Sequence, residues 1–259
     1  MDFEQHIYGM TEEGEAAIVY ILRADNGAEV HISNYGASII AVRVPDSNGK
    51  IENVLLSHND LDSMIKDREY IGRSIDWSVG LRSLGLHNSM WESRFETNRV
   101  VMSLDMEGTP NISFEAIFDF DDDMSLEVTY LAKSDGATQM DIAPNIFFNL
   151  SGVSESTLSG HTLRVNSEEF SSIEEIAPRR GEADIEVKGT KAGILSFMAE
   201  LRDSKSGRGV EILSSKEVMN ICSGGARETI ALTPRNLSIR EIAAEELYCE
   251  KMVYKFSVH

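Results

Sequence analysis

The sequence predicts an all-β protein, built as one large antiparallel β-sandwich with few short helices. Three observations carry this prediction: apolar residues recur mostly at every second position, turn sequences separate these runs, and helical periodicity is sparse. Many short strands joined by tight turns are typical of a sandwich or barrel, and not of a parallel α/β sheet. No linker, repeat or low-complexity stretch interrupts the 259 residues, so we expect a single domain over residues 1–259.

The clearest strand is predicted at Ile112–Phe120. Every second residue from Ile112 onward is apolar, so these side chains would share one buried face, with mostly polar neighbours on the other. Turn sequences such as Asp25-Asn26-Gly27 and Ser134-Asp135-Gly136 separate strands of this kind. Similar runs are Ala17–Leu22, Glu29–Ser33, Ser38–Val44, Arg99–Asp105, Leu126–Leu131, Thr162–Val165, Val210–Leu213, Val218–Cys222, Thr229–Leu232 and Met252–Val258.

Two short helices are also expected. The first is predicted at Leu61–Ile71, because Asn59-Asp60 precedes it as a capping sequence. The second is predicted at Ile194–Leu201 from the spacing of its apolar residues.

Charge and composition exclude several classes of protein. With 24 Lys+Arg against 43 Asp+Glu the net charge is −19, which would repel nucleic acid and anionic membrane surfaces. The longest apolar run, near Ala16–Leu22, is well below the roughly 18 residues of a spanning helix. The acidic start Met1-Asp2-Phe3-Glu4 is unlike a signal peptide, and Cys222 and Cys249 are too few for a disulfide framework. We therefore expect a cytoplasmic protein with reduced, buried thiols.

Motifs read one at a time do not identify a chemistry. The six histidines have no metal-ligand spacing, no CxxC or HExxH occurs, and Ser223-Gly224-Gly225 is better explained as a turn than as a phosphate loop. The run Asp121–Asp123 is a candidate cation site, but a solvated loop between two strands explains it better. No metal or organic cofactor is expected.

Four separated segments, in order, resemble the aldose 1-epimerase (galactose mutarotase) family. Ile32–Ile40, with the following Val44-Pro45-Asp46, is similar to the opening N-Y-G-A hairpin of the family. Phe147–Gly152 is similar to its Y-F-N-L-x-G stretch. The third and fourth segments are Ser206-Gly207-Arg208 and Gly225–Thr229. The resemblance covers nearly the whole chain and implies a divergent member with the galactose mutarotase-like supersandwich.

The resemblance also implies a chemistry. In family members a carboxylate deprotonates the anomeric hydroxyl of a sugar while a histidine protonates the ring oxygen, and the opened chain closes on its other face. One base and one acid must therefore be held on opposite sides of the hemiacetal. Glu228 matches the base position of the family, and a paired or solvated surface glutamate is the alternative.

The acid position departs from the family pattern. Asn145 stands where the family has histidine; a carboxamide can hydrogen-bond the ring oxygen but cannot titrate near neutrality. His87, in a shortened Leu86–Trp91 segment, matches another family histidine and is the candidate acid, with a loop histidine of no catalytic role as the alternative.

Further positions are carried over as substrate contacts. Arg73 is predicted to bind a sugar hydroxyl, with a surface ion pair as the alternative. Trp91 and Trp77 are predicted to stack on the apolar face of a sugar, with burial under a loop as the alternative. Gly193 stands where the family has a substrate-binding aspartate, which weakens hexose recognition.

Three functions remain open from the sequence. The protein interconverts sugar anomers with Glu228 as base, or is a carbohydrate-binding module without catalysis, or is an enzyme that uses the same cleft for a non-hexose substrate in biosynthesis. The expected partner is a small sugar or polyhydroxylated molecule, not nucleic acid or membrane. The chain is expected to be a monomer, or a homodimer formed through exposed strand edges.

Overall fold

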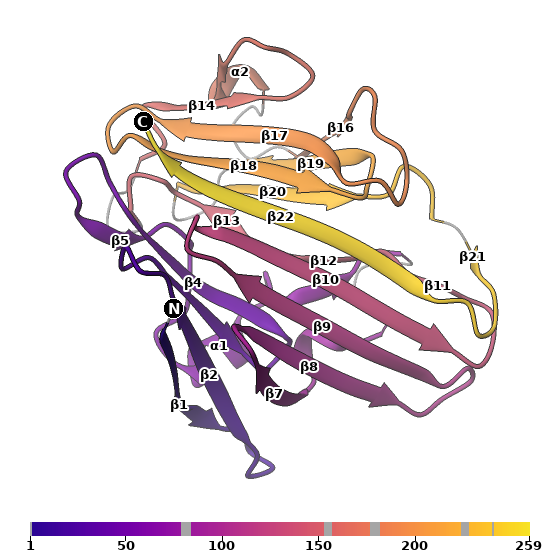
Figure 1. Cartoon of the computed structure of the whole chain (residues 1–259). Coiled ribbons are helices and arrows are strands. Elements are labelled where there is room, and N and C mark those ends of the chain that lie inside the picture. Colours follow the sequence, from indigo (N-terminus) through magenta and orange to yellow (C-terminus); the bar gives the residue numbers. More distant parts are fainter. Residues whose placement is uncertain (1, 79–83, 153–156, 177–181, 224–227, 240) are drawn as a thin grey trace.

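The largest sheet of the computed structural model has nine antiparallel strands, and β22 lies at its centre (Figure 1). β22 is hydrogen-bonded to β18 on one side and to β10 on the other, although it is the strand nearest the C-terminus. In spatial order the strands are β15 (Ser171–Ser172), β14 (His161–Arg164), β17 (Ser196–Asp203), β18 (Arg208–Ser214), β22 (Tyr248–Val258), β10 (Ser125–Ser134), β9 (Ile112–Phe120), β8 (Arg99–Met106) and β7 (Glu92–Glu96).

The structure describes residues 2–78, 84–152, 157–176, 182–223, 228–239 and 241–259. Within these ranges, four smaller sheets accompany the nine-stranded sheet. A five-stranded sheet follows the sequence order: β1 (Asp2–Met10), β2 (Ala16–Arg23), β3 (Glu29–Ser33), β4 (Ser38–Pro45) and β5 (Ile51–Asn53). A four-stranded sheet contains β13 (Phe147–Phe148), β20 (Ile230–Arg235), β19 (Val218–Ser223) and β16 (Glu182–Glu186). The two-stranded sheets are β11 (Thr138–Gln139) with β21 (Glu241–Ile242), and β12 (Ile142–Pro144) with β6 (Ser74–Asp76).

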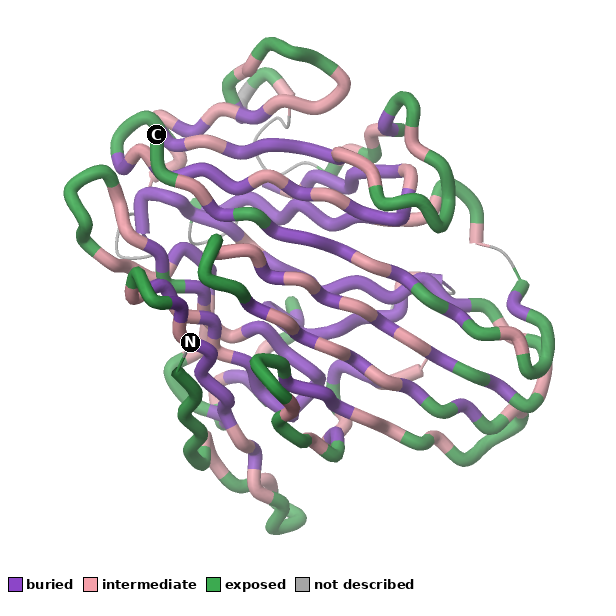
Figure 2. The backbone as a smooth tube through the Cα atoms, in the orientation of Figure 1, coloured by how far each residue is buried: buried purple, intermediate pink, exposed green. Residues whose placement is uncertain are grey.

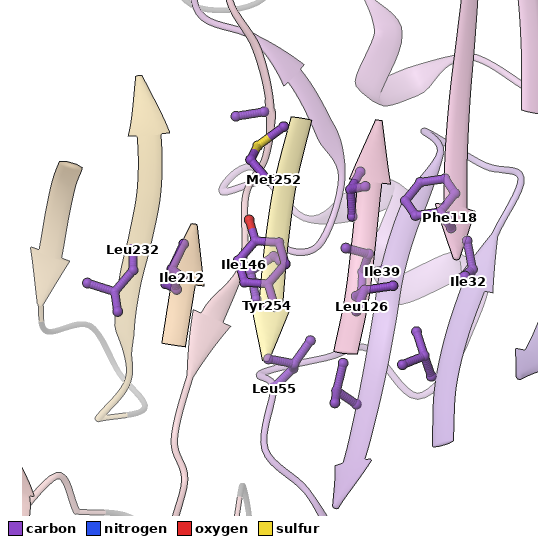
Figure 3. Packing of buried hydrophobic residues seen from close by; sticks show 14 of the residues in the cluster. Ile32, Ile39, Leu55, Phe118, Leu126, Ile146, Ile212, Leu232, Met252 and Tyr254 are labelled. Carbon is purple, nitrogen blue, oxygen red and sulfur yellow. The ribbon is translucent and has the colours of Figure 1, made fainter. Parts of the chain in front are cut away.

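The hydrophobic core lies between the nine-stranded sheet and the smaller sheets (Figures 2 and 3). Figure 3 shows Ile212 of β18 and Tyr254 of β22 close to Leu232 of β20. β9 follows the predicted pattern: its residues alternate between buried and more exposed positions from Ile112 to Phe120. The all-β prediction is confirmed.

The helices are short. α1 begins after Asp60, whose side chain accepts a hydrogen bond from the Ser63 N–H at 2.8 Å, as the capping sequence predicted. The expected helix at Leu61–Ile71 ends early, because the Asp67 carboxylate accepts hydrogen bonds from the N–H groups of two later residues. The bounds are α1 (Leu61–Lys66), the 3-10 helix η1 (Leu86–Asn88) and α2 (Ile173–Ile176).

The helix predicted at Ile194–Leu201 is wrong. This segment enters β17, which pairs with β14 and β18. The register against β18 shifts between Phe197 and Ala199, so the alternation of apolar and polar residues is interrupted. The interrupted pattern has helix-like spacing although the backbone is extended.

Other expectations have mixed outcomes. The acidic run forms a turn, in which the Asp121 side chain accepts hydrogen bonds from the backbone of Asp123 and Ser125. Both cysteines are free, but neither is fully buried: Cys222 in β19 is half-buried, and Cys249 is exposed because β22 turns it away from the core. Among the described helices, none has the length and apolar content needed to span a bilayer.

Candidate functional site

The ladder of β6 and β12 brings two predicted site residues together. Arg73 directly precedes β6 and Asn145 directly follows β12. The Gly72 N–H donates to the Asn145 carbonyl at 2.7 Å, and the Asn145 N–H donates to the Arg73 carbonyl at 2.9 Å. Arg73 and Asn145 are therefore neighbours, although β7 to β11 separate them along the chain.

The Asn145 side chain anchors a loop. Its amide nitrogen donates to the Glu69 carbonyl at 2.7 Å and to the Tyr70 carbonyl at 3.4 Å, and the residue is 6% exposed. An amide committed to two backbone carbonyls holds the backbone of residues 69–70 in place. The amide N–H groups of Asn145 therefore serve to hold this loop.

The same loop is held at its other end by Asp67. Its carboxylate accepts from the Glu69 N–H at 2.9 Å and the Ile71 N–H at 2.8 Å, and lies 3.2 Å from the His58 imidazole. Burial alone would raise the pKa of Asp67, but the interactions with His58 and the two N–H groups outweigh it and lower the pKa to about 2. These contacts fix the loop that carries Tyr70, which has a positive φ of 54°.

Arg73 is a buried cation, and two of the three nitrogen atoms of its guanidinium have no hydrogen-bond partner among the described residues. The residue is 0% exposed, and its Nη1 donates to Asn88 Oδ1 at 2.8 Å and to the His87 carbonyl at 3.4 Å. The rings of Tyr35 and Tyr70 lie 5.4 and 5.1 Å from its Cζ. Within the described part of the chain, its Nε and Nη2 have no hydrogen-bond partner. Burial lowers the pKa of Arg73, partly opposed by the tyrosines and by Asp67.

The two other cations buried this deeply in the described part of the chain are compensated. Arg208 donates to the carbonyls of three residues, at 3.1 Å (Val44), 3.0 Å (Leu150) and 2.8 Å (Lys50). Lys216 Nζ lies 2.6 Å from Asp141 Oδ1 and also donates to a backbone carbonyl. Arg73 differs from both, because it has neither a carboxylate within ion-pair distance nor a full set of acceptors.

His87 lies on the other side of the same cluster. It belongs to η1, is 4% exposed, and packs edge-on against Tyr70 with ring centroids 4.2 Å apart. We name Tyr35, Tyr70, Arg73, His87 and Asn145 the Arg73 cluster. Three of the five predicted site residues therefore meet in one place.

Glu228 makes its hydrogen bonds with a different part of the chain, residues 149 and 158. It is exposed just before β20, and its Oε2 accepts a hydrogen bond from the Leu158 N–H at 3.2 Å. Its backbone carbonyl accepts from Asn149 Nδ2 at 3.1 Å. Neither Arg73 nor Asn145 shares a hydrogen bond with Glu228, and residues 224–227, the rest of that predicted motif, lie outside the described residues. Its assignment as the base stays a prediction.

The predicted aromatic and glycine positions are also placed. Trp91 is 2% exposed within the core, and its indole N–H donates to the Leu86 carbonyl at 3.2 Å. Trp77 is partly buried, and the Arg235 guanidinium lies 4.6 Å above its ring. Gly193 lies in an exposed turn with a φ of +78°, and a Cβ added there would meet no described atom within 4 Å.

Sequence reasoning missed the partners of Arg73 and a second buried network. Tyr35 lies in the N-Y-G-A segment and Tyr70 just before Gly72, but neither motif indicates that both rings flank one guanidinium. Asp141 pairs with Lys216 and with the Arg235 Nε at 2.8 Å, and burial of Asp141 is outweighed by these cations, so that its pKa is lowered. No sequence signal linked these distant residues.

A surface hollow and the arrangement of possible metal ligands are two further features of the described residues. A surface hollow of about 650 Å³ lies at the β8–β9 turn, lined by residues 105–108 and 111–113, and contains none of the predicted site residues. Across the described ranges, no group of three or more His, Cys, Asp or Glu side chains is placed to hold a metal ion.

Comparisons with known proteins place the fold. No protein-family profile and no curated protein sequence matches the chain. Among solved structures, the GalM/aldose epimerase homologue from C. elegans aligns with a TM-score of 0.78 at 16% identity, over 94% of this chain and 99% of that one. Galactose 1-epimerase from Lactobacillus acidophilus NCFM aligns with a TM-score of 0.76 at 15% identity, over 99% of each chain. A putative aldose 1-epimerase from Escherichia coli K12 aligns with a TM-score of 0.67 at 12% identity, over 97% of this chain and 100% of that one.

These alignments extend over nearly the whole chain at low identity. The protein therefore has the galactose mutarotase-like fold, as the four sequence segments predicted. Identities of 9–16% establish the fold and leave the activity to the site itself.

Proposed function

We propose that this protein binds a sugar or a closely related polyhydroxylated molecule at the Arg73 cluster. The observation that carries the proposal is the buried guanidinium of Arg73, whose Nε and Nη2 have no partner. A buried donor without an acceptor costs about 1–3 kcal/mol, and more when it is charged. A ligand oxygen at this edge of Arg73 would remove that cost.

The surroundings of Arg73 suit such a ligand. Tyr35 and Tyr70 flank the guanidinium, and aromatic rings pack well against the C–H faces of sugars. Tyr70 is held by the loop that Asn145 and Asp67 anchor. The backbone of this loop would thus be in place before binding, which reduces the ordering cost.

Binding is tested by ligand-observed saturation-transfer NMR with D-galactose and D-glucose. We compare the wild type with Arg73→Gln and with Arg99→Gln, a matched change at an exposed arginine of β8. The wild type and Arg99→Gln should give the same transfer signal, and Arg73→Gln should lose most of it. Equal signals in all three proteins would remove Arg73 from the binding site.

A second candidate function is catalysed interconversion of sugar anomers. It is favoured by the exposed carboxylate of Glu228, of which Oε2 alone accepts a hydrogen bond, so that Oε1 is available to take a proton. His87 would then supply the proton to the ring oxygen. The solved structures with this fold include a galactose 1-epimerase.

Catalysis is tested by polarimetry of α-to-β interconversion of D-glucose and D-galactose. If Glu228 is the base, Glu228→Gln should lower the catalysed rate at least about 100-fold, the scale of general-base catalysis, and His87→Ala should lower it similarly. Glu92→Gln, at an exposed glutamate of β7, is the matched control. Sugar binding without any catalysed rate in the wild type would leave binding as the function.

A further inference from the structure

The charge of Arg73 is the feature that its hydrogen bonds do not explain. The chain has 43 acidic residues, yet Arg73 makes no ion pair with any residue that the structure describes, whereas the equally buried Lys216 is paired with Asp141. Asp67 favours the charged form of Arg73, but its oxygens already contact His58 and two backbone N–H groups. A buried charge without a counter-ion is strongly unfavourable, so binding of an anion at these atoms would stabilise the site.

The unused atoms of Arg73 define the shape of that anion. Nε and Nη2 lie on the same edge of the planar guanidinium, and their N–H bonds point in parallel. Such an edge matches the two oxygens of a carboxylate in a bidentate pair. The opposite edge is occupied, since Nη1 donates to Asn88 and to the His87 carbonyl.

The neighbouring charges favour a carboxylate over a phosphate. The groups that act on Arg73 are Asp67 and tyrosines 8, 35 and 70, and all of them favour its charged form. A single cation balances a singly charged carboxylate, whereas a phosphate near neutral pH carries close to two charges. The tyrosine rings add no second cation.

We infer that the ligand of the Arg73 cluster is a sugar acid, whose carboxylate forms a bidentate pair with Nε and Nη2 of Arg73. This inference rests on the proposed function and specifies its ligand class. Because these atoms are closed to solvent, a side chain over the cluster must move when the carboxylate binds. Tyr70, which stacks on Arg73 and is 9% exposed, is positioned to do so.

The test uses four ligands that differ at one position: D-glucuronate, its neutral isostere D-glucuronamide, D-glucose and D-glucose 6-phosphate. Affinities are measured by isothermal titration calorimetry with the wild type, Arg73→Gln and Arg99→Gln. We expect the wild type and Arg99→Gln to bind glucuronate at least about tenfold more tightly than glucuronamide, the effect of one charged hydrogen-bonded pair. Arg73→Gln should bind the two equally.

Each other result is decisive. Equal affinity for glucuronate, glucuronamide and glucose, lost in Arg73→Gln, would keep the proposed function and overturn the carboxylate. Tighter binding of glucose 6-phosphate than of glucuronate would overturn it in favour of a phosphate. Absence of binding by all four ligands would overturn both proposals.

A second readout separates ligand contact from a structural role. The Nε–H resonance of Arg73 in a ¹⁵N spectrum, assigned by its loss in Arg73→Gln, should shift on titration with glucuronate and not with glucuronamide. Arg73→Lys keeps the charge but loses the parallel edge, and should lose the preference for glucuronate. This variant decides the question if Arg73→Gln fails to fold; retention of the preference in Arg73→Lys would contradict the bidentate geometry.

Discussion

Replacing each of two buried arginines by methionine should have opposite effects on stability. Arg208 joins three separated segments through its bonds to the carbonyls of Val44, Lys50 and Leu150. Arg73 is buried as deeply but has two unused donors and no ion pair. Methionine fills much of the same volume in both places, so the comparison isolates the guanidinium.

The magnitudes follow from these contacts. Arg208→Met removes three hydrogen bonds from a charged group, but the carbonyls of Leu150 and Lys50 keep another donor each. At the lower end of the range for charged hydrogen bonds, Arg208→Met should therefore lower the free energy of unfolding by about 4 kcal/mol. Arg73→Met loses one good hydrogen bond and two ring contacts, about 2 kcal/mol, and removes a buried charge that costs several kcal/mol. We expect Arg73→Met to unfold with the same free energy as the wild type or up to about 2 kcal/mol more.

The assay is urea unfolding followed by circular dichroism and tryptophan fluorescence, with free energies taken from the midpoint and slope. Arg99→Met, at an exposed arginine, is the control and should change the free energy by less than about 0.5 kcal/mol. If Arg73→Met destabilises the protein as much as Arg208→Met, the charge of Arg73 is compensated within the fold. That result would contradict the proposal that Arg73 takes a carboxylate ligand.

Two further predictions concern the loop over the Arg73 cluster. Because the pKa of Asp67 is lowered to about 2 from 3.8, its contribution to stability is complete above about pH 4 and is lost as the pH falls toward 2. We expect this contribution to be about 2 kcal/mol of unfolding free energy, measured by urea unfolding at several pH values. It should be absent in Asp67→Asn and retained in Asp62→Asn. A pH dependence in Asp67→Asn equal to that of the wild type would contradict this assignment. Asn145→Ala should lower the free energy of unfolding by about 1–3 kcal/mol. Asn145→Asp should lower it further at pH 7, because a carboxylate cannot donate to the two carbonyls that it would face. The extra cost should shrink at lower pH, and equal stability of the two variants at pH 7 would show that the amide does not anchor the loop.

Much of the fold was predictable because burial in a sheet imposes a period of two on the sequence. Ile112–Phe120 shows this period without interruption, and its strand was predicted to the residue. The segment at Ile194–Leu201 was misassigned because a register shift inserts one residue into that period. Local pattern therefore predicts strands where the ladder is regular and fails where it is not.

The candidate site was less predictable, since its contacts join distant segments. Resemblance selected Arg73, His87 and Asn145, and these residues do meet. It did not indicate that Asn145 is committed to loop carbonyls, or that Tyr35 flanks the same guanidinium. Such facts depend on which segments the chain topology brings together, and no spacing in the sequence records them.

The central place of β22 has a consequence for biosynthesis. On the ribosome β22 emerges after every other strand, so β10 and β18 expose unpaired edges until Tyr248–Val258 has left the exit tunnel. A nascent chain stalled before Tyr248 would hold two separate four-stranded ribbons, each prone to join another polypeptide. Protection of these ribbons by a chaperone would matter most in the interval between the emergence of β18 and that of β22.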